Sequence, residues 1–393
     1  MVISAFTGFY TGVADSVLSN YFKEAYDATA TQRGFIEIPR ELPGVLALFV
    51  ITAFSFLRDI KTAIISQVFG IIGMLALGIF HPSFAIMLLF VFIFSMGQHM
   101  NIPLFDSIGL SLATRENMGR VLSGFKSVNT AFVMISGIVC FFGFRFGFFH
   151  FNIPVTIFLI CAGCFVVIAV LLAAMHGQIG KEIESRTEQG KMIFRKEYTR
   201  YYVISAIFGA RKQIMFAFSP WVLIELLGFK ADIMSILGVI GAFIGIFFIR
   251  AIGKWIDGMG ARKVMLIEAL CFIVMYIVYG MLSKWVNENV VILTGLGMLL
   301  IYALYIIDRM TLQFYMVRAI YMKSIAVKEE DVTPSLSAGM AIDHVLSIVC
   351  ALICGVIWDK AGPEYVFVFA AALSAANFAA VWGIKKDNVI DRV

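Results

Sequence analysis

The sequence predicts an all-α polytopic membrane protein, with twelve transmembrane helices in two pseudo-symmetric six-helix halves. Two observations carry most of this prediction. The chain of 393 residues is 61% hydrophobic and only 15% charged, whereas soluble domains average about 25% charged residues and cannot bury so much apolar surface. Its apolar runs are also long enough to cross a bilayer as helices, and charged or Pro/Gly-rich breaks separate them.

The first six helices are expected between the N-terminus and residue 176. A polar outer segment, residues 23–37, separates the first helix from the second. The second helix opens with Pro39 and Pro43, and prolines are tolerated at a helix start but kink an interior, so this end is expected to be bent or broken. The expected helices cover residues 2–22, 39–56, a run ending at 81–82, 84–106, a run ending at 145, and 154–175.

The second six helices are expected after a charged cytoplasmic linker over residues 177–200. The division is therefore an N-terminal half, residues 1–176, the linker, and a C-terminal half, residues 201–393. Internal repeats of this kind are common in transporters. The expected helices start near residue 201, cover 233–249, 264–281 and 290–317, start again after 334, and cover 365–384.

A glycine-punctuated turn between the eighth and ninth helices is the most informative stretch of the chain. It reads Gly253-Lys-Trp-Ile-Asp257-Gly-Met-Gly260-Ala-Arg262-Lys263. The glycines permit a sharp reversal, and Asp257 is expected just ahead of the ninth helix, where the helix dipole favours a carboxylate. Arg262 and Lys263 are expected at the lipid headgroups. The alternative is an ordinary basic loop, because a short motif is weak evidence alone.

The pattern G-x-x-x-D-x-x-G-x-R-K resembles the helix 8–9 signature of the major facilitator superfamily. One position departs from the signature, since Gly258 stands where the family usually has a basic residue. The segment from Ser55 to Asp59 repeats the interval from Gly253 to Asp257 and is interpreted as a shortened copy. The resemblance implies secondary transport by alternating access, and a cytoplasmic gate formed by Gly253, Asp257, Gly260, Arg262, Lys263 and Asp59.

The orientation follows from the basic residues, which are concentrated on alternate loops. By the positive-inside rule, both termini and the central linker are expected in the cytoplasm. Short loops favour a bacterial inner membrane as the location. A receptor or scaffold without transport would need a sizeable soluble domain, and no loop much exceeds about 25 residues, so a transporter is favoured.

Ionisable residues within the helices mark the candidate path, because such groups are costly in a membrane and usually face a cavity or each other. In the superfamily that the chain resembles, helices 1, 4, 7 and 10 line the central cavity, and most of these residues fall there. The substrate is expected at the midplane between the two halves. Its candidate ligands are Arg211, Lys212, Gln213, Asp308, Arg309 and His99, and the candidates for proton coupling are Asp343, His344 and Asp15.

The two arginines Arg211 and Arg309 favour an organic anion, because guanidinium groups bind carboxylate or phosphate bidentately. An equally weighted interpretation makes Arg211 or Lys212 an internal ion pair with Asp308 or Asp343. The alternative function is proton-driven efflux of hydrophobic or cationic drugs, anchored by aspartates such as Asp15.

The remaining expectations are mostly negative. The chain contains no P-loop, H-E-x-x-H or G-x-S-x-G motif, which argues against an enzyme or an ATP-driven pump. Cys161 and Cys164 have no neighbouring ligands that would complete a metal site. We expect no cofactor, no metal and no nucleic-acid partner. The expected partners are a small solute, protons or another coupling ion, and the lipid bilayer, with the protein a monomer.

Overall fold

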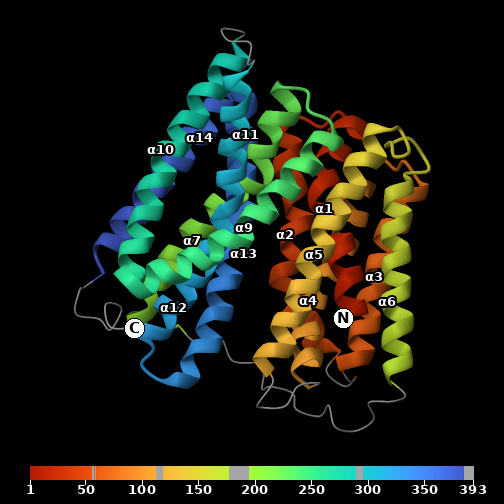
Figure 1. Cartoon of the computed structure of the whole chain (residues 1–393), viewed down its shortest axis with the longest axis horizontal. Coiled ribbons are helices and arrows are strands. Elements are labelled where there is room, and N and C mark those ends of the chain that lie inside the picture. The colour runs from red at the N-terminus through yellow and green to blue at the C-terminus, as the bar shows by residue number, and fades with distance from the viewer. Residues whose placement is uncertain (55–56, 58, 112–117, 177–193, 289–294, 385–393) are drawn as a thin grey trace. The chain divides into compact units, whose positions relative to one another are not determined.

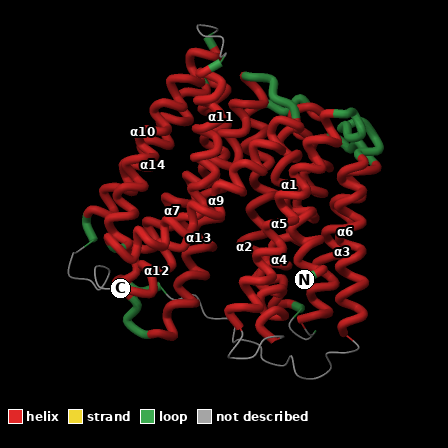
Figure 2. Tube along the Cα trace, viewed as in Figure 1, coloured by secondary structure: helices red, strands yellow, loops and turns green. Residues whose placement is uncertain are grey.

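The computed structural model describes residues 1–54, 57, 59–111, 118–176, 194–288 and 295–384. All regular structure in these residues is helical, with no strand among them (Figure 2). The helices of the sequence's first half are α1 (Val2–Tyr26), α2 (Ala30–Ala53), α3 (Asp59–Ile79), α4 (Phe84–Ser111), α5 (Met118–Arg145) and α6 (Thr156–His176). The predicted linker falls mostly outside the described residues.

In the second half of the sequence, two of the membrane crossings are divided into shorter helical segments (Figure 1). The seventh membrane crossing is α7 (Thr199–Gln213), the π-helical turn η2 (Ile214–Phe218), α8 (Ser219–Trp221) and a second π-helical turn η3 (Val222–Leu226). The tenth is α11 (Leu296–Arg309), the 3-10 turn η4 (Met310–Phe314) and α12 (Tyr315–Ile325). The others are α9 (Ala231–Met259), α10 (Ala261–Asn287), α13 (Val332–Lys360) and α14 (Pro363–Trp382).

Nine helical stretches of the described chain are long and apolar enough to cross a membrane. The three further crossings, α1, α2 and the run from α7 to η3, are more polar than this criterion allows. Together they make the predicted all-α protein of twelve transmembrane helices. A polar crossing must hide its polar groups from lipid, so these three helices are the natural ones to line an interior.

One compact unit contains residues 1–27, 38–187 and 230–239. Its helices approach closely where glycine replaces a side chain, as where Gly8 of α1 meets the Asn129 backbone of α5. Its interior holds a hydrogen-bonded polar cluster, in which Gln67 Nε2 donates to Asn101 Oδ1 at 2.6 Å and Asn101 Nδ2 donates to Tyr10 Oη at 3.1 Å. These amide and hydroxyl groups thus bind one another, while Gln67 Oε1 is buried without a hydrogen-bond partner.

The other unit contains residues 28–37, 188–229 and 240–393. In it α10 packs along α14, and α7 packs along α13. The rings of Tyr279 and Phe367 stack with their centroids 4.4 Å apart between α10 and α14. Gly209 of α7 lies against the Asp343 backbone of α13 so closely that a Cβ atom would overlap it. Because residue 209 has no side chain, α7 and α13 can approach this closely.

The predicted polar outer segment, residues 23–37, is wrong, because helix continues through most of it. The first helix reaches Tyr26, and α2 begins at Ala30 and runs through Pro39 and Pro43 without a break. Arg33 and Glu37 explain the error, since they are both fully buried and form an ion pair one helical turn apart. Each charge offsets part of the cost of burying the other, so a polar stretch is accommodated in a buried helix.

Candidate functional site

Arg211 of α7 forms a buried ion pair with Glu268 of α10. Their side chains are only 1% and 5% exposed. The guanidinium also lies over the ring of Phe272, 4.6 Å from its centroid. One nitrogen, Nη2, bonds the carboxylate, while Nε and Nη1 are buried without a hydrogen-bond partner in the structure. Arg211 therefore has an internal counter-charge and still has unused donors.

Asp308 of α11 is fully buried and accepts two hydroxyl hydrogen bonds. Tyr276 Oη donates to its Oδ1 at 2.7 Å, and Ser219 Oγ donates to its Oδ2. Tyr279 Oη then donates to the Ser219 carbonyl at 3.0 Å, which fixes Ser219 in place. The carboxylate is thus held by neutral hydroxyl donors rather than by a cation.

Lys212 pairs with Asp343 of α13, with Nζ 2.7 Å from Oδ1. Ser347 Oγ donates to the Gly209 carbonyl at 2.9 Å and lies 3.4 Å from Asp343 Oδ1. The close contact at Gly209 brings α7 near enough to α13 for the lysine and the aspartate to meet. His344, the neighbouring candidate, is half-buried.

Arg318 of α12 is the residue that the sequence analysis missed. Its guanidinium carbon lies 3.1 Å from the ring centroid of Phe208 and 5.1 Å from that of Tyr315. The residue is 6% exposed, and its Nε and Nη2 are buried without a hydrogen-bond partner. The predicted tenth helix ended at residue 317, whereas the observed crossing continues to Ile325. An apolar run that continues past Arg318 was the available signal.

The remaining predicted substrate and coupling residues are Arg309, Gln213, Asp15 and His99. Arg309 is half-buried, with its guanidinium 5.1 Å from the centroid of Phe216. Gln213 is fully buried, and neither atom of its amide has a partner. Asp15 and His99 belong to the other unit. Asp15 is exposed on α1, and His99 Nδ1 lies 2.9 Å from the Ser95 carbonyl one turn earlier in α4.

The signature turn is tighter than predicted. Gly260, with φ of 83°, makes the reversal in a single residue, so Asp257 lies in the last turn of α9 and not at the entry to α10. Asp257, Gly258 and Lys263 are exposed, and Gly253 is half-buried. Arg262 Nη2 donates to the Trp382 carbonyl at the end of α14, at 2.9 Å. The turn is therefore attached to α14 through Arg262.

In the earlier copy of the signature, the aspartate lies at the start of a helix and not at its end. Asp59 lies in the first turn of α3, where the helix dipole stabilises a carboxylate, and Ser107 Oγ donates to its Oδ2 at 2.6 Å. Residues 55, 56 and 58 of this copy lie outside the described residues. The two aspartates thus occupy opposite ends of helices, which the shared spacing did not predict.

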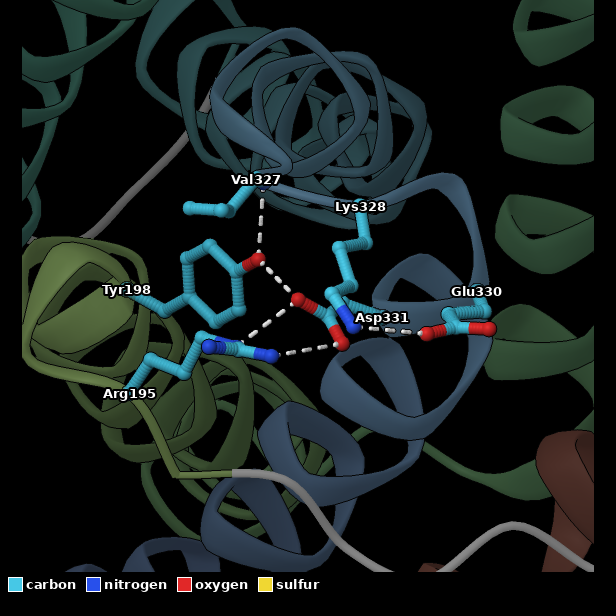
Figure 3. A network of polar contacts seen from close by, with 6 residues as sticks. All are labelled: Arg195, Tyr198, Val327, Lys328, Glu330 and Asp331. Atoms are coloured by element: carbon cyan, nitrogen blue, oxygen red, sulfur yellow. Dashed lines mark hydrogen bonds and ion pairs between the residues drawn. The ribbon is translucent and has the colours of Figure 1, made fainter.

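A further polar cluster joins the chain just before α7 to the turn before α13 (Figure 3). Asp331 is 1% exposed; Tyr198 Oη donates to its Oδ2 at 2.7 Å, and Arg195 Nε lies 2.8 Å from the same oxygen. The Val327 amide donates to Tyr198 Oη at 2.9 Å. The neighbouring carboxylate raises the pKa of Arg195, so this pair stays charged. The cluster anchors the start of the seventh crossing.

Twelve membrane crossings with buried ionisable residues define a polytopic membrane transporter. The family model for the Major Facilitator Superfamily matches residues 1–327, and the chain belongs to this superfamily. It is therefore a secondary transporter and not an enzyme, as the sequence predicted. No curated protein sequence matches it significantly.

Solved structures share this fold at low sequence identity. A mutant form of the nucleoside transporter NupG is 15% identical, with a TM-score of 0.79 over 97% of this chain and 98% of that one. A D-xylose-proton symporter is 13% identical, with a TM-score of 0.68 over 98% and 96%. A POT family transporter in complex with 5-aminolevulinic acid is 11% identical, with a TM-score of 0.74 over 97% and 93%.

Proposed function

We propose that the protein is a proton-coupled transporter of a small organic anion, which the buried arginines of α7 and α12 bind near the membrane midplane. The observation that carries the proposal is that several buried guanidinium nitrogens have no hydrogen-bond acceptor. Arg211 and Arg318 each have two buried nitrogens without a partner. An unsatisfied buried donor costs about 1–3 kcal/mol, so an acceptor-rich ligand would be favoured here.

The charges of this region also favour an anion. The carboxylates Glu268 and Asp343 are each paired with a cation, and Asp308 is held by two hydroxyl groups. A cationic substrate that bound Glu268 or Asp343 would have to separate an ion pair, whereas a carboxylate or phosphate meets donors that are already unused. The ring of Phe208, on which the Arg318 guanidinium lies, holds that donor group in a fixed plane.

The proposed coupling residue is Asp343, with His344 and Asp15 as further candidates. Protonation of Asp343 would release Lys212, and the freed ammonium group would then bind the anion, so one proton and one anion would enter together. Two of the fold neighbours support the proposal: one is a D-xylose-proton symporter, and another was solved with 5-aminolevulinic acid, which carries a carboxylate.

The test is a thermal-shift screen of the purified protein against small carboxylates, phosphate esters, lipophilic cations and sugars, because a ligand that binds only the folded state raises the melting temperature. Stabilisation by an anion is expected, and it should be lost in Arg318→Gln and in Arg211→Gln. Arg250→Gln is the matched control, because Arg250 is exposed on α9.

Two results would contradict the proposal. Stabilisation by lipophilic cations, with none by anions, would favour drug efflux and make the arginines structural. Stabilisation by an anion that persists in Arg318→Gln and in Arg211→Gln would move the binding site away from α7 and α12.

A further inference from the structure

An apolar groove of about 460 Å³ lies between α9, α10 and α11, entirely within the second unit. This volume falls in the range of sites that hold small molecules. Its floor is formed by buried side chains, among them Phe272, Met275 and Phe314. Glu268 is the ionisable member of the lining, and its charge is neutralised by Arg211. The groove is therefore suited to a hydrocarbon chain.

The rim of the groove faces outward from the helices. Trp255, Ile267 and Ile307 line it and are 41%, 49% and 46% exposed, and Cys271 is exposed beside them. Large apolar side chains that are exposed on a membrane-crossing helix meet lipid. An apolar rim of this kind is suited to contact with lipid.

Positive charge is concentrated at one end of the groove. Met259 and Val264 line that end, on either side of the α9–α10 turn. Lys263 lies one helical turn before Ile267 on α10, so both side chains share an exposed face. Lys254 is exposed next to Trp255. A chain in the groove would therefore have its polar end beside these ammonium groups.

We infer that this groove is a binding site for an anionic phospholipid, with one acyl chain in the groove and the headgroup phosphate at Lys263 and Lys254. The acyl chain exchanges with those of other lipids, so the preference comes from the headgroup. A lysine near a membrane surface contributes enough attraction to an anionic lipid to change its binding about fivefold. The inference rests on the membrane crossing and the groove alone, and is independent of the transported substrate.

The test is native mass spectrometry of the protein with equimolar phosphatidylglycerol and phosphatidylcholine of identical acyl chains. Wild-type protein is expected to retain phosphatidylglycerol preferentially, and Lys263→Gln should lower the ratio of the two retained lipids about fivefold. Lys61→Gln is the matched control, because Lys61 is exposed at the start of α3, two residues after the earlier copy of the signature. Its ratio should equal that of the wild type.

Cys271 provides an independent measurement on the unaltered chain, because it is exposed on the groove while the other five cysteines are buried. Added phosphatidylglycerol should slow its alkylation by N-ethylmaleimide more than phosphatidylcholine does. Equal retention of the two lipids, a ratio unchanged in Lys263→Gln, or alkylation insensitive to phosphatidylglycerol would each overturn the inference. In those cases ordinary bilayer lipid covers the groove.

Discussion

Replacing Glu268 with glutamine would leave the Arg211 guanidinium buried without its counter-charge. Both residues are almost inaccessible to solvent, so water cannot stabilise the remaining charge. Removing one partner of a buried ion pair costs about 3–5 kcal/mol. For a protein of this size each kcal/mol corresponds to roughly 1.2 °C, so the melting temperature should fall by roughly 4–6 °C.

A second variant separates lost charge pairing from lost packing. In the double variant Arg211→Met, Glu268→Leu both charges are replaced by apolar groups, and such replacements are often neutral or stabilising. Its melting temperature should therefore exceed that of Glu268→Gln, although Arg211 is absent and anion binding is lost.

The assay is differential scanning fluorimetry of the three proteins in the same detergent, with circular dichroism to confirm that each is helical. A melting temperature of Glu268→Gln equal to that of the wild type would refute this prediction, because the burial of an unpaired Arg211 would then carry no electrostatic cost. The prediction is also refuted if the double variant is less stable than the single one. That order would show that packing against Phe272, and not charge pairing, dominates at this position.

Three further predictions concern separate contacts. Gly209→Ala should lower the melting temperature by an amount equivalent to about 1–3 kcal/mol, because its Cβ would overlap the Asp343 backbone; a stability equal to the wild type would show that α7 and α13 separate easily. Tyr198→Phe should cost about 1–3 kcal/mol in the same assay, because the Val327 amide and Asp331 lose their hydroxyl partner; Tyr365→Phe, at an exposed position of α14, serves as the control. Asp343→Asn should abolish accumulation driven by a pH gradient in proteoliposomes while substrate exchange continues, and unimpaired accumulation would remove Asp343 from the coupling site.

The fold class was predictable because length and hydropathy of apolar runs are properties of the sequence alone. Helix ends were less predictable. Residues 23–37 read as a polar loop because the rule that charge marks a loop ignores pairing, and the Arg33–Glu37 pair exists only once α2 is folded and packed. The error at the tenth helix has a similar origin, since a charged Arg318 resembles a helix end until its contact with Phe208 is known.

Most members of the candidate site stood out in the sequence, whereas most of their pairings did not. Arg211, Lys212, Asp308 and Asp343 stood out as charges inside apolar runs, and Lys212 does meet Asp343 as one interpretation allowed. Glu268 as the partner of Arg211 depends on how α7 packs against α10, which no spacing within one helix reveals. Hydroxyl donors such as Tyr276 carry no charge and therefore gave no signal.

The π-helical turns of the seventh crossing change the helix face on which the later residues lie. Each i→i+5 turn accommodates an extra residue, so the side chains after it are rotated relative to those of a continuous α-helix. A helical wheel drawn from Arg211 through Ser219 would assign Ser219 to the wrong face. In a cysteine scan of residues 199–226, accessible positions should recur every 3.6 residues as far as Gln213 and then shift in phase after the first π-helical turn, η2.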